Sequence, residues 1–333
     1  MKKKILITAV SLLVGGILLS VAGLALAGFD FKKLGSAGIE TNTYEITDSF
    51  ENISINVDTA DVRFVKSTDG KCKLVCQEKS RQKHVATVHN DTLTIENSED
   101  LKWYDYINIG ADNQCVTLYL PESAYSSLTV ITDTGDVDMP TTFTYQTALV
   151  ETDTGDITWK ATVIGALSLT ADTGDIDVIG MGATSLLAQT NTGDIELSSL
   201  QCQTASITTD TGSIELDKVT VIGTLTLAAD TGDIELSIVL CKNVSITSDT
   251  GEVECEGLLA GEKISIRTDT GDVSLRGCDG ASLWIQTDTG DVRGNLLTDK
   301  HYIAKSSTGD IEVPETVGGR CEITTNTGDI YFR

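Results

Sequence analysis

The sequence predicts an all-β protein, a single-stranded parallel β-solenoid of the β-helix type with coils of 19–20 residues. The pair Thr-Gly returns eleven times between residues 134 and 328, always at one of these two spacings. Apolar and polar residues alternate on both sides of each pair, which is the period of a β-strand. The apolar columns keep their place from coil to coil, so each coil can bury its apolar face only against its neighbours.

Each coil contains one turn of sequence Asp-Thr-Gly-Asp or a close variant. The turn glycines are Gly135, Gly155, Gly174, Gly193, Gly212, Gly232, Gly251, Gly271, Gly290, Gly309 and Gly328. We expect them to be structural, because glycine adopts positive φ at no steric cost. Two residues before the glycine the chain has Asp, Asn or Ser, whose side chains accept hydrogen bonds from N–H groups two residues on.

Two apolar columns flank the turn. The residue two after the glycine is always Ile or Val, as at Ile214, and the residue five before it is Val, Leu, Ile or Ala, as at Ile207. Seven steps separate the columns, so the turn must exchange strand faces, as a corner or a bulge does. Apolar residues seven past the glycine predict a third, shorter side: Leu200, Val219, Val239, Leu258 and Leu297.

Residues 1–28 form a segment of their own, a transmembrane helix or signal-like sequence. Three lysines at residues 2–4 precede an apolar run, and residues 5–27 are long enough to cross a bilayer. The lysines predict a single-pass protein of the cell membrane with a cytoplasmic N-terminus and its bulk outside. The alternative is secretion after signal cleavage, since residues 25–27 read Ala-Leu-Ala.

The remaining chain divides into a linker at 29–43, an irregular β region at 44–124 and the solenoid repeats at 125–333. Within the irregular region, residues 58–61 read Asp-Thr-Ala-Asp and resemble a degenerate turn. We expect this region to cap the solenoid, because the first coil needs an atypical neighbour. No capping sequence follows the turn at Gly328, so we expect an exposed last coil there.

Several of these features together resemble a bacterial family of unknown function labelled "putative adhesin". They are the apolar segment followed by Gly-Phe-Asp-Phe at 28–31, the strand at 93–95, Leu-Pro at 120–121 and the Thr-Gly-Asp coils. The resemblance covers nearly the whole chain. It implies an extracytoplasmic β-repeat protein of the cell envelope, with a surface role and no established catalytic residues.

The chain is strongly acidic, with a formal net charge of −25. Residues 1–33 hold five lysines and one aspartate, so the rest carries 19 basic and 48 acidic residues. Such a surface repels nucleic acid and anionic lipid headgroups. The expected partners are therefore the membrane, through residues 5–27, and envelope proteins, glycans or cationic peptides.

Aspartates after the glycines predict a carboxylate ladder. Its members, the candidate metal ligands, are Asp136, Asp156, Asp175, Asp194, Asp233, Asp272, Asp291, Asp310 and Asp329. Unit charges about 4.8 Å apart repel by roughly 0.9 kcal/mol in water, so backbone N–H groups, raised pKa values or bound cations should relieve them. Two interpretations stay open: a ladder capped by backbone and solvent, with no cofactor, or calcium sites.

Motifs of known enzymes carry no catalytic signal here. Asp-Thr-Gly is also the aspartic-protease signature, but that chemistry needs two aspartates converging in one cleft. A retaining glycosidase needs one pair of carboxylates about 5 Å apart, and a uniform ladder singles out no pair. The histidines His84, His89 and His301 have no cysteine at metal spacing and are expected to be solvated.

Cysteines and aromatic residues add structural expectations. Cys255, Cys278 and Cys321 fall in apolar columns, where they should act as small core residues. Cys115 has the alternatives of pairing with Cys72 or with Cys76. The aromatic stretch at 103–106 is a candidate ligand contact or a loop that covers the core.

These observations predict a non-enzymatic envelope scaffold, adhesin-like, that presents a rigid acidic solenoid to its partners. The alternative is a divalent-cation-binding module that uses the aspartate ladder. A carbohydrate-active enzyme of the β-helix type is a more distant alternative.

Overall fold

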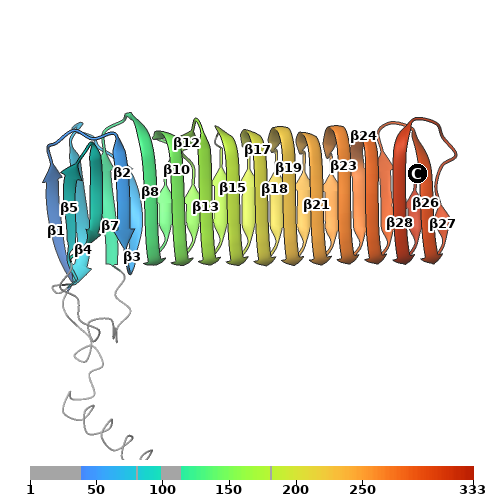
Figure 1. The fold of residues 1–333 in the computed structure, drawn as a ribbon, viewed down its shortest axis with the longest axis horizontal. Coiled ribbons are helices and arrows are strands. Elements are labelled where there is room, and N and C mark those ends of the chain that lie inside the picture. The colour runs from blue at the N-terminus through green and yellow to red at the C-terminus, as the bar shows by residue number, and fades with distance from the viewer. Residues whose placement is uncertain (1–38, 80–81, 99–113, 181) are drawn as a thin grey trace, which may run out of the picture.

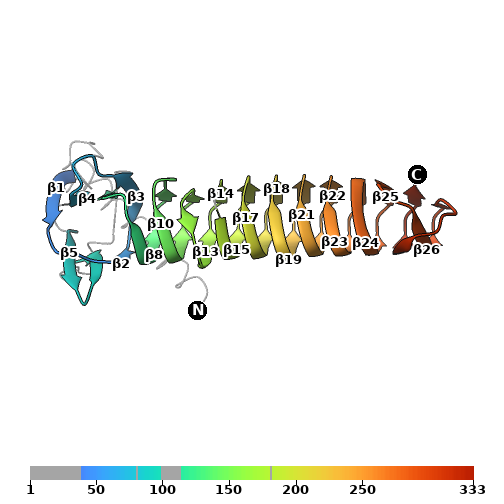
Figure 2. The same ribbon diagram turned by 90° about the horizontal axis from the view of Figure 1, so that it is seen from above.

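The computed structural model describes residues 39–79, 82–98, 114–180 and 182–333, and these form strands and no helix. They confirm the parallel β-solenoid: long and short strands alternate along the chain and stack into a rod (Figures 1 and 2). Two sheets result, which we call the long-strand sheet and the short-strand sheet. The bounds of their strands follow.

The irregular N-terminal region contributes β1 (Ile39–Ile46), β2 (Asn52–Val57), β3 (Ala60–Lys66), β4 (Cys72–Lys79), β5 (His84–His89), β6 (Thr92–Asn97) and β7 (Gln114–Leu120). The long-strand sheet continues with β8 (Ala124–Thr134), β10 (Thr144–Thr154), β12 (Thr162–Val163), β13 (Ala166–Thr173), β15 (Gly182–Thr192), β17 (Gln201–Thr211), β19 (Thr220–Thr231), β21 (Leu240–Thr250), β23 (Leu259–Thr270), the second part of β24 (Val273–Thr289), β26 (Lys300–Thr308) and β28 (Gly319–Thr327). The short-strand sheet continues with β9 (Val137–Met139), β11 (Ile157–Trp159), β14 (Ile176–Ile179), β16 (Ile195–Ser198), β18 (Ile214–Asp217), β20 (Ile234–Ser237), β22 (Val253–Glu256), the first part of β24, β25 (Val292–Leu296), β27 (Ile311–Glu312) and β29 (Ile330–Phe332).

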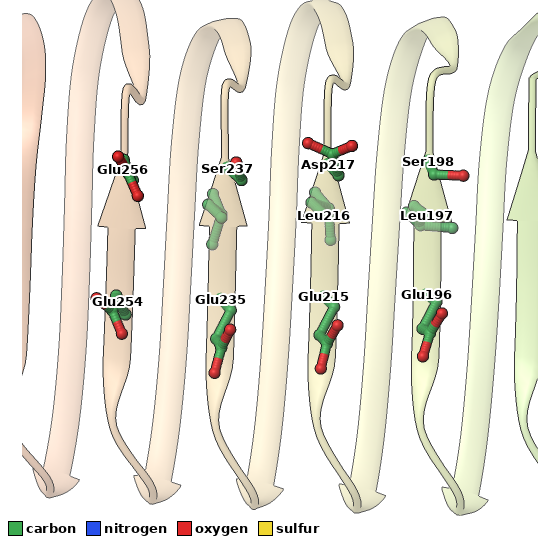
Figure 3. A pocket seen from close by; sticks show the side chains of 11 residues that line it. Glu196, Leu197, Ser198, Glu215, Leu216, Asp217, Glu235, Ser237, Glu254 and Glu256 are labelled. Atoms are coloured by element: carbon green, nitrogen blue, oxygen red, sulfur yellow. The ribbon is translucent and has the colours of Figure 1, made fainter.

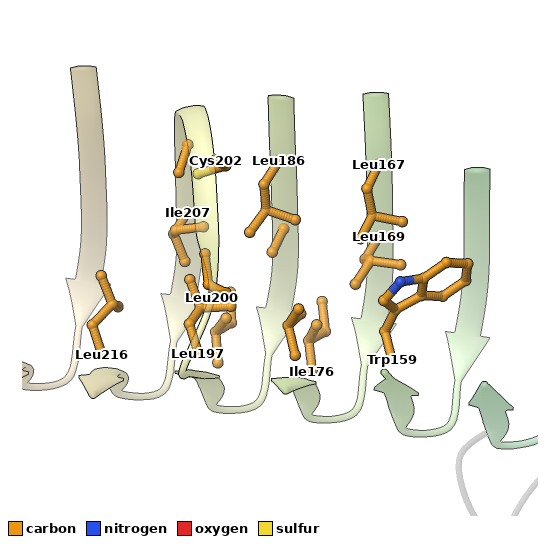
Figure 4. Close-up of a cluster of buried hydrophobic side chains, with 14 of the residues drawn as sticks. Trp159, Leu167, Leu169, Ile176, Leu186, Leu197, Leu200, Cys202, Ile207 and Leu216 are labelled. Atoms are coloured by element: carbon orange, nitrogen blue, oxygen red, sulfur yellow. The ribbon is translucent and has the colours of Figure 1, made fainter. Parts of the chain in front are cut away.

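The core lies between the two sheets and consists of the two predicted columns. Ile207 pairs in register with Ala188 and Leu227, and Ile214 pairs with Ile195 and Ile234. Both columns point inward, so the glycine turn is a corner between the sheets, as the odd spacing required. Figure 4 shows these apolar side chains filling the interior.

A second corner follows each of the short strands in the middle of the rod. Its residue has φ between 54° and 67° in six coils: Gly180, Ser199, Lys218, Ile238, Gly257 and Gly277. The inward residue after this corner forms the predicted third side, and Leu200, Val219, Val239 and Leu258 are buried there. The prediction that Leu297 belongs to this third side is wrong, because its side chain is 63% exposed.

At the N-terminal end, the degenerate turn takes part in the solenoid. β2 pairs in parallel with β8 and β6, and β3 pairs in parallel with β9 and β7. Ala60 is the neighbour of Gly135, as the sequence of the turn indicated. Beyond these strands, β4, β1 and β5 add in antiparallel pairs and change the stacking pattern at this end.

At the C-terminal end, the coils are not stacked in sequence order. β28 lies between β24 and β26, and β29 lies between β25 and β27, so the coil of Gly328 separates those of Gly290 and Gly309. The expectation of an exposed coil at Gly328 is therefore wrong. The end coil is that of Gly309, where Ile311 is 45% exposed (Figure 1).

Candidate functional site

The turn glycines form a ladder in which neighbouring backbones almost touch. All eleven have φ between 140° and 158°, as predicted from their sequence context. The N–H of Gly212 donates to the carbonyl of Thr231 at 2.9 Å, and a Cβ on Gly212 would lie 2.0 Å from the carbonyl oxygen of Gly193. Close stacking is thus a second reason for glycine, and the sequence alone did not reveal it.

The aspartates after the glycines cap the backbone of the next turn. Asp175 Oδ1 accepts the N–H of Asp194 at 2.8 Å, and Asp194 Oδ1 accepts the N–H of Ser213 at 2.7 Å. The acceptors of this kind are Asp61, Asp136, Asp156, Asp175, Asp194, Asp233, Asp272, Asp291 and Asp329. Asp310, in the end coil, donates its N–H to Asp329. One oxygen of each acceptor is therefore committed to the backbone.

The residues two before the glycines behave differently from the prediction. Among the described residues, no hydrogen bond joins these side chains to the N–H two residues on, because that glycine N–H donates to a threonine carbonyl of the neighbouring coil, as Gly212 does to Thr231. Burial, and then the charges of Asp58 and Asp153, raise the pKa of Asp133. Asn191 relieves one such repulsion by donating to Asp172 Oδ1 at 3.2 Å.

A second acidic row, which the sequence analysis missed, follows the outer face of the short-strand sheet. Glu196, Glu215 and Glu235 occupy equivalent positions on consecutive strands, and Glu254 continues the row (Figure 3). They line a shallow groove of about 280 Å³, floored by leucines of the same strands. The signal was the acidic residue three after the glycine, which alternates with the inward column.

Electrostatic repulsion accumulates along this row. Burial, and then the charges of Asp177, Glu215 and neighbouring aspartates, raise the pKa of Glu196. The pKa of Asp177 is raised in the same way, by burial and then by Asp175. Within the described part of the chain, only Glu254 in this row has an ion pair, with Arg276. The groove therefore concentrates negative charge that the chain itself leaves largely uncompensated.

A second hollow, of about 490 Å³, lies at the N-terminal end and is partly apolar. Phe50 and Tyr125 line it, and their rings stack with centroids 6.1 Å apart. Tyr125 also stacks on Tyr145, and the ring of Tyr145 packs at a tilt of 52° against the fully buried Trp159. Tyr145 and Trp159 lie on β10 and β11, the two strands that flank the turn at Gly155.

A buried polar cluster joins three strands at the same end. Glu78 on β4 is fully buried, and its Oε2 accepts the N–H of His84 at 2.6 Å and contacts His84 Nδ1 at 2.8 Å. Its Oε1 accepts from Asn42 Nδ2 at 2.7 Å and from Tyr44 Oη at 3.2 Å. Burial by itself would raise the pKa of Glu78. These hydrogen bonds and the charge of His84 outweigh burial, so the pKa of Glu78 is lowered.

His84 therefore differs from the solvated histidine that was expected. It is 3% exposed, whereas His89 on the opposite face of β5 is exposed. The Sγ of Cys76 completes a group of three buried residues whose ligand atoms lie within 4.8 Å of one another. Sequence spacing could not show this, because β4 and β5 belong to different sheets.

The cysteines of the described residues are all free thiols. Cys255, Cys278 and Cys321 are fully buried in the core, as predicted. Cys202 and Cys241 both pair with Val221 from opposite sides and so lie two coils apart.

Two predicted features fall outside the described residues: the apolar segment at 5–27 and the aromatic stretch at 103–106. In the part of the chain that the structure describes, no helix has the length and apolar character to cross a membrane. Each Asp-Thr-Gly turn from Gly135 onward belongs to the one ladder, which gives the tripeptide a structural use.

The chain is similar to a known protein family and to several solved structures. The family model Toastrack DUF4097 matches residues 50–240 and 239–333, whereas no curated protein sequence matches. A structure described as a "putative adhesin" from Bacteroides fragilis NCTC 9343 is 16% identical, covers 90% of this chain and 98% of that chain, and has a TM-score of 0.33. A "putative lipid binding protein" from Parabacteroides distasonis ATCC 8503 is 14% identical, covers 88% and 97%, and has a TM-score of 0.39. The family model spans most of the chain, and the protein therefore belongs to the Toastrack DUF4097 family.

Proposed function

We propose that the protein is a non-enzymatic scaffold of the cell envelope that binds cationic segments of partner molecules along its short-strand sheet. The observation that carries this proposal is the row Glu196, Glu215 and Glu235, for which the described residues provide no ion pair. The long, flexible side chains of a lysine-rich peptide can reach carboxylates that repeat about 4.8 Å apart, and the attraction grows with each matched pair. Envelope proteins and glycans with basic groups are the corresponding natural partners.

The test is calorimetric binding of a lysine-rich peptide to the full-length protein at several salt concentrations. We expect the double variant Glu215→Gln, Glu235→Gln to lose affinity at least tenfold and to show a weaker salt dependence. Glu151→Gln is the matched control, because Glu151 is an exposed carboxylate on the long-strand sheet between Ile131 and Thr170. Equal affinities in all three proteins would contradict the proposal.

A divalent-cation module is the second candidate, and the aspartate ladder supports it. The N–H groups of neighbouring turns fix Oδ1 of residues such as Asp175, which leaves Oδ2 oriented for a cation or for solvent. Calcium would then raise the unfolding temperature saturably, beyond magnesium and sodium at matched ionic strength. An increase no larger than that of the salt controls would reject this candidate.

We also propose that residues 5–27 anchor the protein in the cell membrane, with its solenoid outside. The three lysines at residues 2–4 and the apolar run support this orientation. Protease added to intact cells should then degrade the solenoid. If the solenoid is degraded only after the cells are lysed, it lies inside the cell and the proposed orientation is wrong.

A further inference from the structure

The cluster of Cys76, Glu78 and His84 combines the three side-chain types that hold zinc-class ions: thiolate, carboxylate and imidazole. Cys76 and Glu78 are fully buried and His84 is 3% exposed. Their ligand atoms lie within 4.8 Å of one another. Ligands around a tetrahedral zinc are about 3.5 Å apart, from bond lengths of 2.0–2.3 Å, so a small adjustment would bring this group into range.

The two carboxylate oxygens of Glu78 have different hydrogen-bond partners. Oε1 is held by Asn42 and Tyr44, both on β1, as an orienting partner holds a metal-binding carboxylate. Oε2 accepts the backbone N–H of His84 at 2.6 Å and faces Nδ1 of the His84 ring across 2.8 Å. Oε2 is thus the oxygen that can turn from a proton to a metal ion while β1 keeps the carboxylate in place.

A divalent ion would displace the thiol proton of Cys76, because metals deprotonate the thiols that coordinate them. When neutral His84 donates from Nδ1 to Glu78 Oε2, coordination through Nδ1 moves that proton to Nε2, so it stays on the ring. The loaded site then holds one thiolate, one carboxylate and one neutral imidazole, and the two negative charges balance the divalent ion.

We propose that Cys76, Glu78 and His84 bind one zinc-class divalent ion, which staples the N-terminal end of the solenoid. Cys76 and Glu78 lie on β4 of the short-strand sheet, and His84 lies on β5 of the long-strand sheet. The ion therefore joins the two sheets at the end where antiparallel strands replace the regular coils. Entry is through β5, an edge strand that pairs with β6 alone among the described strands.

The test is titration of the full-length, chelator-treated protein with cobalt(II) and then with zinc(II). We expect one ion per chain, the near-ultraviolet absorption of a thiolate–cobalt bond, displacement of cobalt by zinc, and release of about one proton per ion, from the thiol. Cys76→Ser and His84→Gln should lower the affinity at least tenfold. Their controls lie on the same strands: Cys72→Ser on β4 and His89→Gln on β5.

Three outcomes would overturn the proposal: no stoichiometric binding by the parent protein, a cobalt spectrum without the thiolate band, or equal losses in the controls. The spectrum of the parent protein decides the question even if Cys76→Ser does not fold. A rise of the unfolding temperature with zinc in the parent and in Cys72→Ser, but not in His84→Gln, would support the staple.

Discussion

Single residues in this fold are constrained mainly by the turn that they occupy. Gly212 needs both its φ of 145° and the absence of a Cβ, because the carbonyl of Gly193 lies in the way. Gly180 needs only its φ of 62°, since nothing lies within 4 Å of its Cβ position. The two corners of a coil therefore make different demands on glycine.

Substitution of these glycines should separate the two demands. Gly212→Ala should lower the free energy of unfolding by about 3 kcal/mol or more, because overpacking adds to backbone strain. Gly180→Ala should cost about 1–2 kcal/mol, from strain alone. Urea denaturation of both variants checks this, and equal losses would show that the close approach in the ladder is unimportant.

Ile238 is the residue whose conformation fits its side chain least. It is a β-branched residue at φ 54°, and its neighbour in the column is Gly257. Ile238→Gly should raise the free energy of unfolding by about 1 kcal/mol, because the strain disappears while little burial is lost from a side chain that is 53% exposed. Ile222→Gly, at a strand position that is 60% exposed, should lower it instead.

Strand elements were the part of the structure that the sequence predicted best. The columns of Ile207 and Ile214 could be read directly, because every coil repeats them and period two is unambiguous. The row of Glu196 repeats with the same period, three residues after the turn glycine, so the sequence contained the signal for it as well. The pairing of Glu78 with His84 was beyond reach, since no repeat relates β4 to β5 and the contact depends on how the antiparallel end folds.

Carboxylate rows on the strands should shape the pH dependence of stability. The raised pKa values of Asp177 and Glu196 mean that the folded state binds protons more tightly there than the unfolded state. Stability should therefore rise as the pH falls from 7 through these raised values to the ordinary carboxyl pKa of about 4. At lower pH the trend should reverse, because Glu78 has a lowered pKa and loses its contribution when it is protonated.

Thermal unfolding across the pH range measures this curve. The rise between pH 7 and the ordinary carboxyl pKa of about 4 should flatten in 1 M sodium chloride, which screens the repulsion between exposed carboxylates. Glu196→Gln should also reduce the rise. A curve that falls steadily from pH 7 downward would show that the rows do not repel one another in the folded protein.

The whole molecule departs from its repeat pattern at both ends. At one end, β4, β1 and β5 pair antiparallel to their neighbours. At the other end, the coil of residues 319–333 stacks between two coils that precede it in the sequence. The insertion escaped the sequence analysis for a physical reason: the spacing of 19 residues and the Ile and Gly columns are the same whichever order the coils take. Local patterning specifies a coil, whereas only contacts between coils specify its place.

Deletion of residues 319–333 should remove more than one coil. β26 and β27 pair with β28 and β29 alone among the described strands, so they would lose their backbone partners as well. Hydrogen exchange should then show unprotected amides in residues 300–312 while β21 remains protected. Persisting protection in β26 would mean that this coil can stack directly on the coil of Gly290.

The inserted coil also separates the order of synthesis from the order of assembly. Ribosomes complete residues 300–312 before residues 319–333, so growing chains can add coils one after another only as far as Gly290. The coil of Gly309 must therefore stay undocked, or dock with a gap one strand wide, until residues 319–333 have been synthesised and fill that gap. Folding from the N-terminus is therefore vectorial for most of the rod and becomes a joint, all-or-none event in its final two coils.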